Sequence, residues 1–324
     1  NLSFTAPSSA ACLQYIFSGN STVTGTLTCA GATPTRRIFL LSDTLGTTRT
    51  FTVNSLSATD CDFRDITIAG AAAGSSPTRA GDCGGNSGIT FPAAKTVYWN
   101  LGGGSQDWSA TAWAPGSGGT PDINNFPLAQ DTAVFDNAGA ITRVATDRNW
   151  NIGTVNMSGR TTAMEWSSNF SPSYYGNWLF GTGVTTISNS GQMSFVGRDT
   201  QTITSNGVTF NNPVGIDGIT GTVQLADALI LASSRTLTFT SGTFNAVTYN
   251  VTAGAFSSSN SNTRTLRMGT GIWTLGSTGT LWGLSTTTNL VFYKDSANIV
   301  LSDTGTSSRT FQGGGLSYLS LIHI

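Results

Sequence analysis

Leu41-Ser42-Asp43-Thr44, four further residues and then Arg49-Thr50-Phe51 form a pattern that returns near the other end of the chain. The second copy is Leu301-Ser302-Asp303-Thr304, four residues, and Arg309-Thr310-Phe311. Its Arg-Thr-apolar core occurs twice more, as Arg235-Thr236-Leu237 and Arg264-Thr265-Leu266. The copies are spaced unequally. Repeats at unequal spacing are typical of a solenoid whose coils carry loops of variable length.

Short alternating segments lie between these copies, each bounded by turn-forming residues. Examples are residues 222–225, 236–239, 289–292, 298–301 and 61–68. One such strand cannot bury its apolar side alone, but strands stacked at about 4.8 Å spacing close a continuous inner ladder. We therefore expect an all-β protein, a β-solenoid like a parallel β-helix. The inner ladder is expected to include Leu237, Phe239, Leu290 and Ile299.

The composition excludes several other classes of protein. Among 324 residues there are 52 Thr, 38 Ser and 39 Gly but only two Lys and one Glu, so a helical bundle lacks its usual helix formers. Fifteen cations face 16 anions, which argues against a nucleic-acid partner. No apolar run reaches 18 residues, so no membrane-spanning helix is expected. Low net charge and 10% aromatic residues argue against disorder.

The segment 98–140 interrupts the alternating pattern with Gly, Pro and three tryptophans, Trp99, Trp108 and Trp113. We expect the three indoles to pack together and hold this segment as an ordered insert. The predicted organisation is an N-terminal solenoid segment with four cysteines at 1–97, a Trp/Gly/Pro-rich insert at 98–140 and C-terminal solenoid repeats at 141–319.

The two ends of the sequence are unusual. The chain starts at Asn1 rather than Met, so we expect either a removed leader or a fragment of a longer protein. Residues 320–324 resemble the translation of a sequencing adapter read into an environmental gene. We expect these five residues to be a non-native tail on a metagenomic fragment.

Two stretches carry a resemblance to known proteins. Trp99, the glycines at 102–104, Trp108, Trp113, Pro115 and then residues 131–136, Asp-Thr-Ala-Val-Phe-Asp, look like a module of bacterial surface β-solenoids, including autotransporter-type passengers. The Arg-Thr-Leu and Gly-x-Trp strands, with residues 309–316 at their end, look like repeats of phage tail and other virion-associated proteins. The resemblance covers most of residues 38–319.

This resemblance implies a structural or adhesive role rather than an enzymatic one. The protein would belong to a phage tail fibre, a virion appendage or a bacterial surface adhesin, and would be extracellular, on a cell surface or on a virion. Its partner would be a host-surface glycan or receptor, and assembly as a homotrimer is left open. No catalytic residue and no cofactor are implied.

Four cysteines, Cys12, Cys29, Cys61 and Cys83, lie in the first quarter of the chain. They form no Cys-x-x-Cys pair and have no nearby His, so no metal site is expected. Two interpretations stay open. The cysteines form two disulfides in an exported protein, or they pack as small apolar residues inside the β core.

The enzymatic alternative is a polysaccharide depolymerase, a glycan hydrolase or lyase on the side wall of the solenoid. Asp60 and Asp62 would share one face of a strand, with Asp82 nearby, and paired carboxylates can act as acid and base. However, Asp in a Ser/Thr/Gly background usually caps turns. His323 is the only His, which also excludes a Cys protease built on Cys83. The sequence leaves the question open and favours no enzyme.

Two further groups of residues are candidates for function or support. The aromatic cluster Trp166, Tyr174, Tyr175 and Trp178 could stack on sugar rings, or it could plug a bend in the coil, which we favour. Each repeated arginine, Arg49, Arg235, Arg264 and Arg309, follows a turn and precedes a strand. We expect each guanidinium to donate hydrogen bonds to carbonyls of the neighbouring turn.

Overall fold

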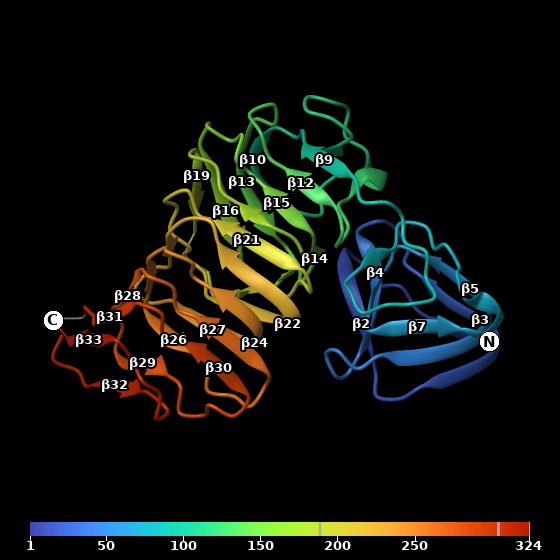
Figure 1. The fold of residues 1–324 in the computed structure, drawn as a ribbon. Coiled ribbons are helices and arrows are strands. Elements are labelled where there is room, and N and C mark those ends of the chain that lie inside the picture. The colour runs from blue at the N-terminus through green and yellow to red at the C-terminus, as the bar shows by residue number, and fades with distance from the viewer. Residues whose placement is uncertain (188, 303–304, 324) are drawn as a thin grey trace.

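The computed structural model of the protein describes residues 1–187, 189–302 and 305–323. It is a β-solenoid of about 14 turns with half of its residues in strands and 2% in helix, as predicted (Figure 1). Asp303 and Thr304 of the second repeat copy and Ile324 at the end lie outside the described residues. Of the described strand pairs, only β9 (Thr96–Trp99) with β11 (Trp113–Ala114) is antiparallel.

The N-terminal solenoid, residues 2–91, consists of two four-stranded parallel sheets joined at their corners. The first sheet contains β1 (Leu2–Phe4), β3 (Ser21–Ala30), β5 (Arg49–Thr59) and β7 (Ile66–Ala69). The second contains β2 (Ala11–Phe17), β4 (Arg36–Ser42), β6 (Cys61–Arg64) and β8 (Gly81–Asp82). The short helix η1 (Gly70–Ala72) follows β7.

The main solenoid, residues 96–323, has three sheets. The largest covers two sides of the coil, which are joined through its two long strands, and the other two follow one another along the third side. The largest contains β9, β11, β12 (Thr132–Val134), β14 (Asn151–Ile152), β15 (Thr154–Asn156), β17 (Ser173–Tyr174), β18 (Trp178–Leu179), β20 (Met193–Phe195), β21 (Thr200–Thr204), β22 (Val214–Leu225), β24 (Thr236–Asn245), β26 (Ala255–Ser257), β27 (Arg264–Arg267), β29 (Gly279–Gly283), β30 (Leu290–Tyr293) and β32 (Arg309–Gln312). The second contains β10 (Gly103–Asp107), β13 (Ile141–Thr146), β16 (Met164–Ser168) and β19 (Val184–Thr186). The third contains β23 (Leu229–Ile230), β25 (Val251–Ala253), β28 (Ile272–Leu275), β31 (Asn298–Leu301) and β33 (Ser320–His323).

Alternation along each strand decides which side chains enter the core. Within β24, Leu237 and Phe239 are buried while the threonines between them are only partly covered. The register between strands then places apolar side chains of successive coils next to one another, so that Leu237 lies between Val214 of β22 and Phe256 of β26. Ile299 is also buried and Leu290 packs against the same core, which confirms the predicted inner ladder.

All eight tryptophans of the sequence are buried in the main solenoid. Trp113 packs edge-on against Trp99 and Trp108, with ring centroids 5.1 and 4.8 Å apart, as predicted. The predicted boundary at residue 98, however, falls inside β9. Because β9 and β10 pair in parallel with β12 and β13, this segment is the first part of the main solenoid rather than an insert that breaks the ladder.

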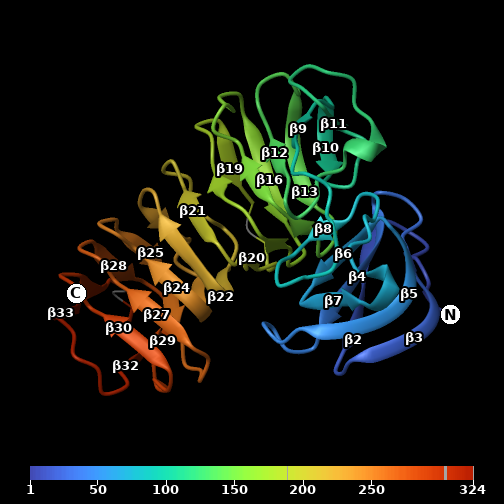
Figure 2. The ribbon, with the colours of Figure 1, turned by 45° about the vertical axis from the view of Figure 1, so that its right-hand side comes forward.

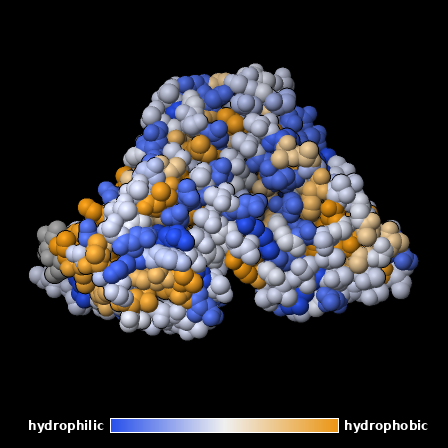
Figure 3. Space-filling model, viewed as in Figure 1, coloured by the Kyte–Doolittle hydropathy of each residue, from blue (hydrophilic) through white to orange (hydrophobic). Residues whose placement is uncertain are grey.

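The N-terminal solenoid packs beside the first coils of the main solenoid and diverges from its C-terminal coils (Figures 1 and 2). A small cluster of buried side chains joins the two parts, with Phe39, Leu41 and Cys83 from one and Ala129 from the other. The space-filling view shows a notch between the two parts (Figure 3). The molecule therefore has a cleft whose walls are the coil corners of two solenoids.

The last described strand, β33, continues the third sheet. Its residues pair in parallel with β31. The residues predicted as a non-native tail therefore take the position of a further coil. The two helices in the described part of the chain, η1 and η2 (Ile123–Asn125), are single turns, and neither is long enough to cross a membrane.

Candidate functional site

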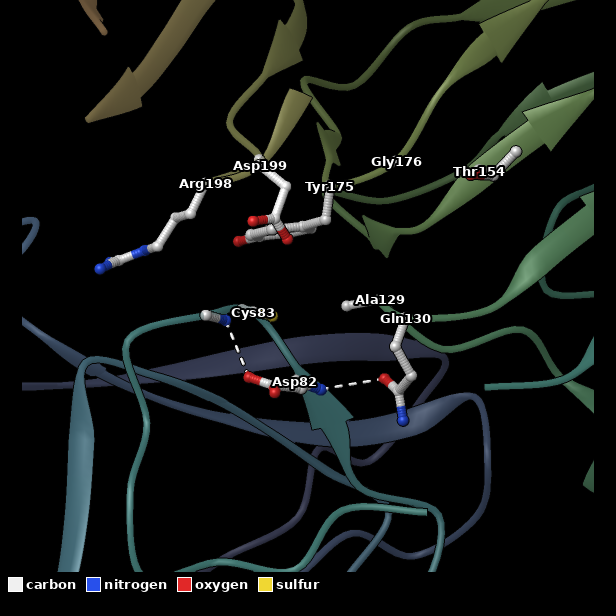
Figure 4. Close-up of a pocket in the computed structure, with 11 residues that line it drawn as sticks. Asp82, Cys83, Ala129, Gln130, Thr154, Tyr175, Gly176, Arg198 and Asp199 are labelled. Carbon is white, nitrogen blue, oxygen red and sulfur yellow. Dashed lines mark hydrogen bonds between the residues drawn. The ribbon is translucent and has the colours of Figure 1, made fainter. Parts of the chain in front are cut away.

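The cleft contains a first hollow of about 310 Å³ where the two solenoids meet (Figure 4). Tyr175 and Asp199 extend into it from the main solenoid and face Cys83 and Asp82 on the N-terminal solenoid. The lining residues are Asp82, Cys83, Gly84, Ala129, Gln130, Thr154, Tyr175, Gly176, Gly197, Arg198 and Asp199. Its functional groups are thus carboxylates, hydroxyls, one thiol, one side-chain amide and one guanidinium.

The N-terminal wall of this hollow is a tight turn after β8. Asp82 Oδ1 accepts hydrogen bonds from the Gly84 backbone N–H at 2.9 Å and from Asn86 Nδ2 at 2.7 Å. Gly85 has a φ of 71°, and a Cβ there would lie 2.5 Å from the Arg198 guanidinium. Glycine is therefore required at this position both for the left-handed backbone and for the approach of Arg198.

The opposite wall carries the one phenol of the hollow. Tyr175 follows β17, and its hydroxyl donates to Asn151 Oδ1 at 3.4 Å. Burial, with Cys83 and Asp62 nearby, raises the pKa of Tyr175 well above its usual 10.0. Tyr175 therefore stays protonated at neutral pH and can donate or accept a hydrogen bond, but it cannot act as a base.

A second hollow of about 390 Å³ lies further along the cleft. Asp43, Thr44 and Leu45 come from the loop between β4 and β5, and the other wall is made of corner residues of β22, β24 and the turn before β27. Those corner residues are Asp217, Ile219, Thr240, Ser241, Asn262 and Thr263. The lining is mostly hydroxyl and carboxylate, with two aliphatic side chains.

The two candidate catalytic carboxylates Asp60 and Asp62 do not line either hollow. Both are buried at a corner of the N-terminal solenoid and bound by arginines: Arg79 donates to both oxygens of Asp60 at 2.6 and 2.8 Å, and Arg37 donates to Asp62. Asn151 of the main solenoid also donates to Asp62, at 3.0 Å. The predicted grouping with Asp82 is therefore not formed, since only Asp82 reaches the cleft.

Asp65 occupies a similar corner and links the two solenoids. Its carboxylate is buried and accepts hydrogen bonds from Arg198 at 2.6 and 2.7 Å and from the Gly46 N–H at 3.0 Å. Both Asp60 and Asp65 have positive φ, at 52° and 57°. Asp tolerates this conformation better than most residues, which explains its place at coil corners.

The aromatic cluster is divided by the structure. Trp166, Tyr174 and Trp178 are buried in the core, with the Trp178 ring centroid 5.0 Å from those of the other two. The suggestion that these three bind glycan is wrong, because inward-facing positions of a closed coil cannot reach a ligand. They fill the coil, as the favoured interpretation predicted. Tyr175 is the member of the cluster that reaches the cleft.

The repeated arginines differ in their partners. Arg264 is buried and donates to the carbonyl oxygens of Ser258, Asn262, Thr286 and Thr288 at 2.7 to 3.0 Å, as predicted. Arg309 is half-buried and donates to carbonyls of its own turn. Arg49 binds the Asp43 carboxylate instead. Arg235 lies half-buried just before β24, where its proposed role stays a prediction.

The four cysteines are free thiols in this structure. Cys29 and Cys61 lie together in the core of the N-terminal solenoid, and the Cys61 thiol contacts the Cys29 carbonyl oxygen. Burial raises the pKa of Cys61 from 9.0 to about 12. These contacts correspond to the interpretation of small apolar residues in a β core, and the alternative of two disulfides is not what the structure contains.

Two residues of the cleft and one arginine of the main solenoid were missed from the sequence. Arg198 and Asp199 line the first hollow and are two adjacent charges in a sequence with only 10% charged residues, which was an available signal. Arg160 donates to five backbone carbonyls, including Asp136 at 2.7 Å, and so plays the role predicted for the repeated arginines. It was missed because Arg160 is followed by two threonines and so lacks the Arg-Thr-apolar pattern of the repeated arginines.

Within the described residues, no three His, Cys, Asp or Glu side chains are grouped so that they could hold a metal ion. The comparisons with known proteins add no family or relative. No protein-family model, no curated protein and no solved structure matches this chain.

Proposed function

We propose that the protein is a non-enzymatic, surface-exposed β-solenoid that serves as a rigid adhesive element and holds a glycan in the cleft between its two solenoids. It would act outside the cell, as part of a phage tail fibre, a virion appendage or a bacterial surface adhesin. These placements rest on the resemblance of its repeats to such proteins.

The observation that supports this role is the chemistry of the cleft. Hydroxyl, amide and carboxylate groups from several coil corners line the two hollows, beside Tyr175 in one and Leu45 and Ile219 in the other. Such a mixture suits a polyhydroxylated ligand, since each sugar offers both donors and acceptors and an apolar ring face. The hollows follow one another along the cleft, as binding to a chain of sugars would require.

The buried ion pairs support a structural role for three aspartates of the N-terminal solenoid. Asp60, Asp62 and Asp65 are all held by arginines, so their oxygens are already occupied by donors. A general acid or base needs access to a substrate proton. These three carboxylates are better suited to joining coils and solenoids than to catalysis.

The test is binding without turnover. Purified protein would be applied to an array of bacterial and host glycans, and any ligand found would be followed by calorimetry while reducing-sugar release is measured. Binding without release would support the proposal. Tyr175→Ala is expected to weaken this binding, whereas Tyr98→Ala, at a partly exposed tyrosine of β9 outside either hollow, leaves it unchanged.

A depolymerase remains the second candidate because of one observation. Asp82 and Asp199 lie on opposite walls of the first hollow, where two carboxylates could flank a sugar. Glycan cleavage that is lost in both Asp82→Asn and Asp199→Asn would establish this candidate and overturn the non-enzymatic proposal. Assembly as a homotrimer also stays a prediction, to be tested by light scattering of the purified protein.

A further inference from the structure

We infer that the cleft selects glycans that carry free amino sugars over N-acetylated and acidic glycans. This inference rests on the proposed function, since it specifies which glycan class the same cleft would hold. The distribution of charge over the two hollows carries it.

The first hollow has an excess of negative charge. Asp82 and Asp199 both line it, and the single cation among its lining residues is Arg198. The Nη2 atom of Arg198 is already committed to the buried carboxylate of Asp65. Asp199 is exposed, and its carboxylate accepts no hydrogen bond from the residues that the structure describes. It is therefore available to a ligand.

The second hollow repeats the same sign of charge. Asp43 and Asp217 line it together with Thr, Ser and Asn, and none of its lining residues is a cation. The Asp43 carboxylate is neutralised by Arg49, which donates to Oδ1 at 2.6 Å. Asp217 accepts one hydrogen bond, from Ser241 Oγ to Oδ1 at 2.8 Å, which leaves its second oxygen for a ligand.

Both hollows therefore offer carboxylate oxygens with free acceptor capacity. These are the side chain of Asp199 and Oδ2 of Asp82 in the first hollow, and the second oxygen of Asp217 in the second. A sugar ammonium placed there forms a charge-assisted hydrogen bond, which is shorter and stronger than a neutral one. N-acetylation removes the positive charge of the sugar amine. A uronic acid carries a negative charge instead, which the aspartates repel. The neighbouring hydroxyls and amides are left to bind the sugar hydroxyls.

Such selectivity would not arise from a general attraction between the whole protein surface and polycations. The formal net charge of the chain is only −1 at neutral pH, so the whole surface has little attraction for a cation. The excess of carboxylates over available cations is local to the cleft. Substitutions there and elsewhere on the surface can consequently separate local from general effects.

The experiment compares three probes on the intact chain: a chitosan oligosaccharide, the fully N-acetylated oligosaccharide of the same length and an oligogalacturonate. Binding is measured by calorimetry at low salt and at a mildly acidic pH that keeps the amine protonated. The variants are Asp199→Asn and Asp217→Asn. Asp107→Asn, at an exposed aspartate of β10 that lines neither hollow, is the matched control.

The chitosan oligosaccharide is expected to bind about tenfold more tightly than its acetylated form, which corresponds to one charge-assisted hydrogen bond. Each cleft variant should lose most of that preference, and raised salt should weaken it. The control should keep it. Thermal unfolding of each variant checks that the substitution has left the fold intact.

The contrary outcomes are distinct. Equal binding of the charged and acetylated probes, or a preference that survives in both cleft variants, would overturn the inference and leave the proposed glycan-binding function standing. Equal loss in Asp107→Asn would also overturn it, because the attraction would then be general. No binding of these probes, together with a blank glycan array, would contradict the proposed function itself.

Discussion

Arg198 of the main solenoid donates hydrogen bonds to both carboxylate oxygens of Asp65, a residue 133 positions earlier in the N-terminal solenoid. The Asp65 side chain is 1% exposed and that of Arg198 20%. This ion pair joins the two solenoids, and its arginine is one of the residues that line the first hollow. Since any ligand in the cleft contacts both walls, the geometry of the site depends on this pair.

Removing Arg198 should destabilise the contact between the two solenoids. In Arg198→Ala the Asp65 carboxylate stays buried without its main partner, and breaking such a pair costs about 3 kcal/mol or more. Arg143→Ala is the matched control, because Arg143 and Glu165 pair at the surface with side chains 43% and 46% exposed, and such a pair is worth at most about 1 kcal/mol. Urea unfolding measures both losses, and an equal loss would contradict this role of Asp65.

Arg264 should contribute far more to stability than Arg309, although both occupy the same place in the repeat. Arg264→Ala removes the guanidinium donor from four carbonyls of two successive coils, of which only that of Ser258 keeps another donor among the described residues, at an expected cost of about 1 to 3 kcal/mol. Arg309 is half-buried and donates to carbonyls of its own turn rather than to those of a neighbouring coil, so its substitution should lower the unfolding free energy by less, about 0.5 kcal/mol. Thermal unfolding of both variants checks this, and similar midpoints would refute it.

Tyr175 and Trp178 should separate binding from stability. Trp178→Phe leaves a void in the core and is expected to lower the unfolding free energy by about 1 to 3 kcal/mol with little change in glycan affinity. Tyr175→Phe keeps the ring but removes the hydroxyl from the first hollow, so it should weaken binding more than it weakens the fold. A folded Trp178→Phe protein that had lost binding would contradict this division.

The thiols should be unreactive in the folded protein. Burial, which is the largest cause for all four cysteines, raises their pKa values, so little thiolate is present at neutral pH. Iodoacetamide is expected to label no cysteine of the native protein at pH 8 and all four in denaturant. Rapid native labelling, or a mass two hydrogens lower for each bridged pair, would contradict free thiols of which three are buried and one, Cys12, is half-buried.

The same burial predicts a loss of stability in alkali. A thiol whose pKa is raised in the folded state stabilises the fold fully at pH below its unfolded pKa, and the contribution is lost as the pH rises towards the folded pKa. For Cys61 this window runs from 9.0 to about 12. The unfolding free energy should therefore fall more steeply across it in the parent than in Cys61→Ala, by up to about 1.4 kcal/mol for each pH unit. Parallel slopes would exclude a contribution from Cys61.

The sequence alone determined the class of fold and the direction of most core side chains. Alternation with a period of two is a local property, so Leu237, Phe239 and Ile299 had to face the same side of their strands, and the shortage of Glu and Lys left no competing helix. The packing of Trp99, Trp108 and Trp113 was also predictable, because three large indoles in a Gly- and Pro-rich segment are expected to pack together and hold it in place. Arg264 was predictable because it stands between a turn and a strand, where turn carbonyls need a donor, although Arg49 shows that the same place in the repeat can hold a different partner.

Only the tertiary structure decided where the site lies. Asp60 and Asp62 looked like a catalytic pair because they are two residues apart in the sequence, but Asp60 lies at a corner before β6 and their environment depends on Arg79, Arg37 and Asn151. Tyr174 and Tyr175 are adjacent in sequence, yet one fills the core and the other reaches the cleft. The position of the cleft depends on which coil corners of the two solenoids meet. This is set by contacts such as Arg198 with Asp65, between residues too distant in the sequence for any local pattern to relate.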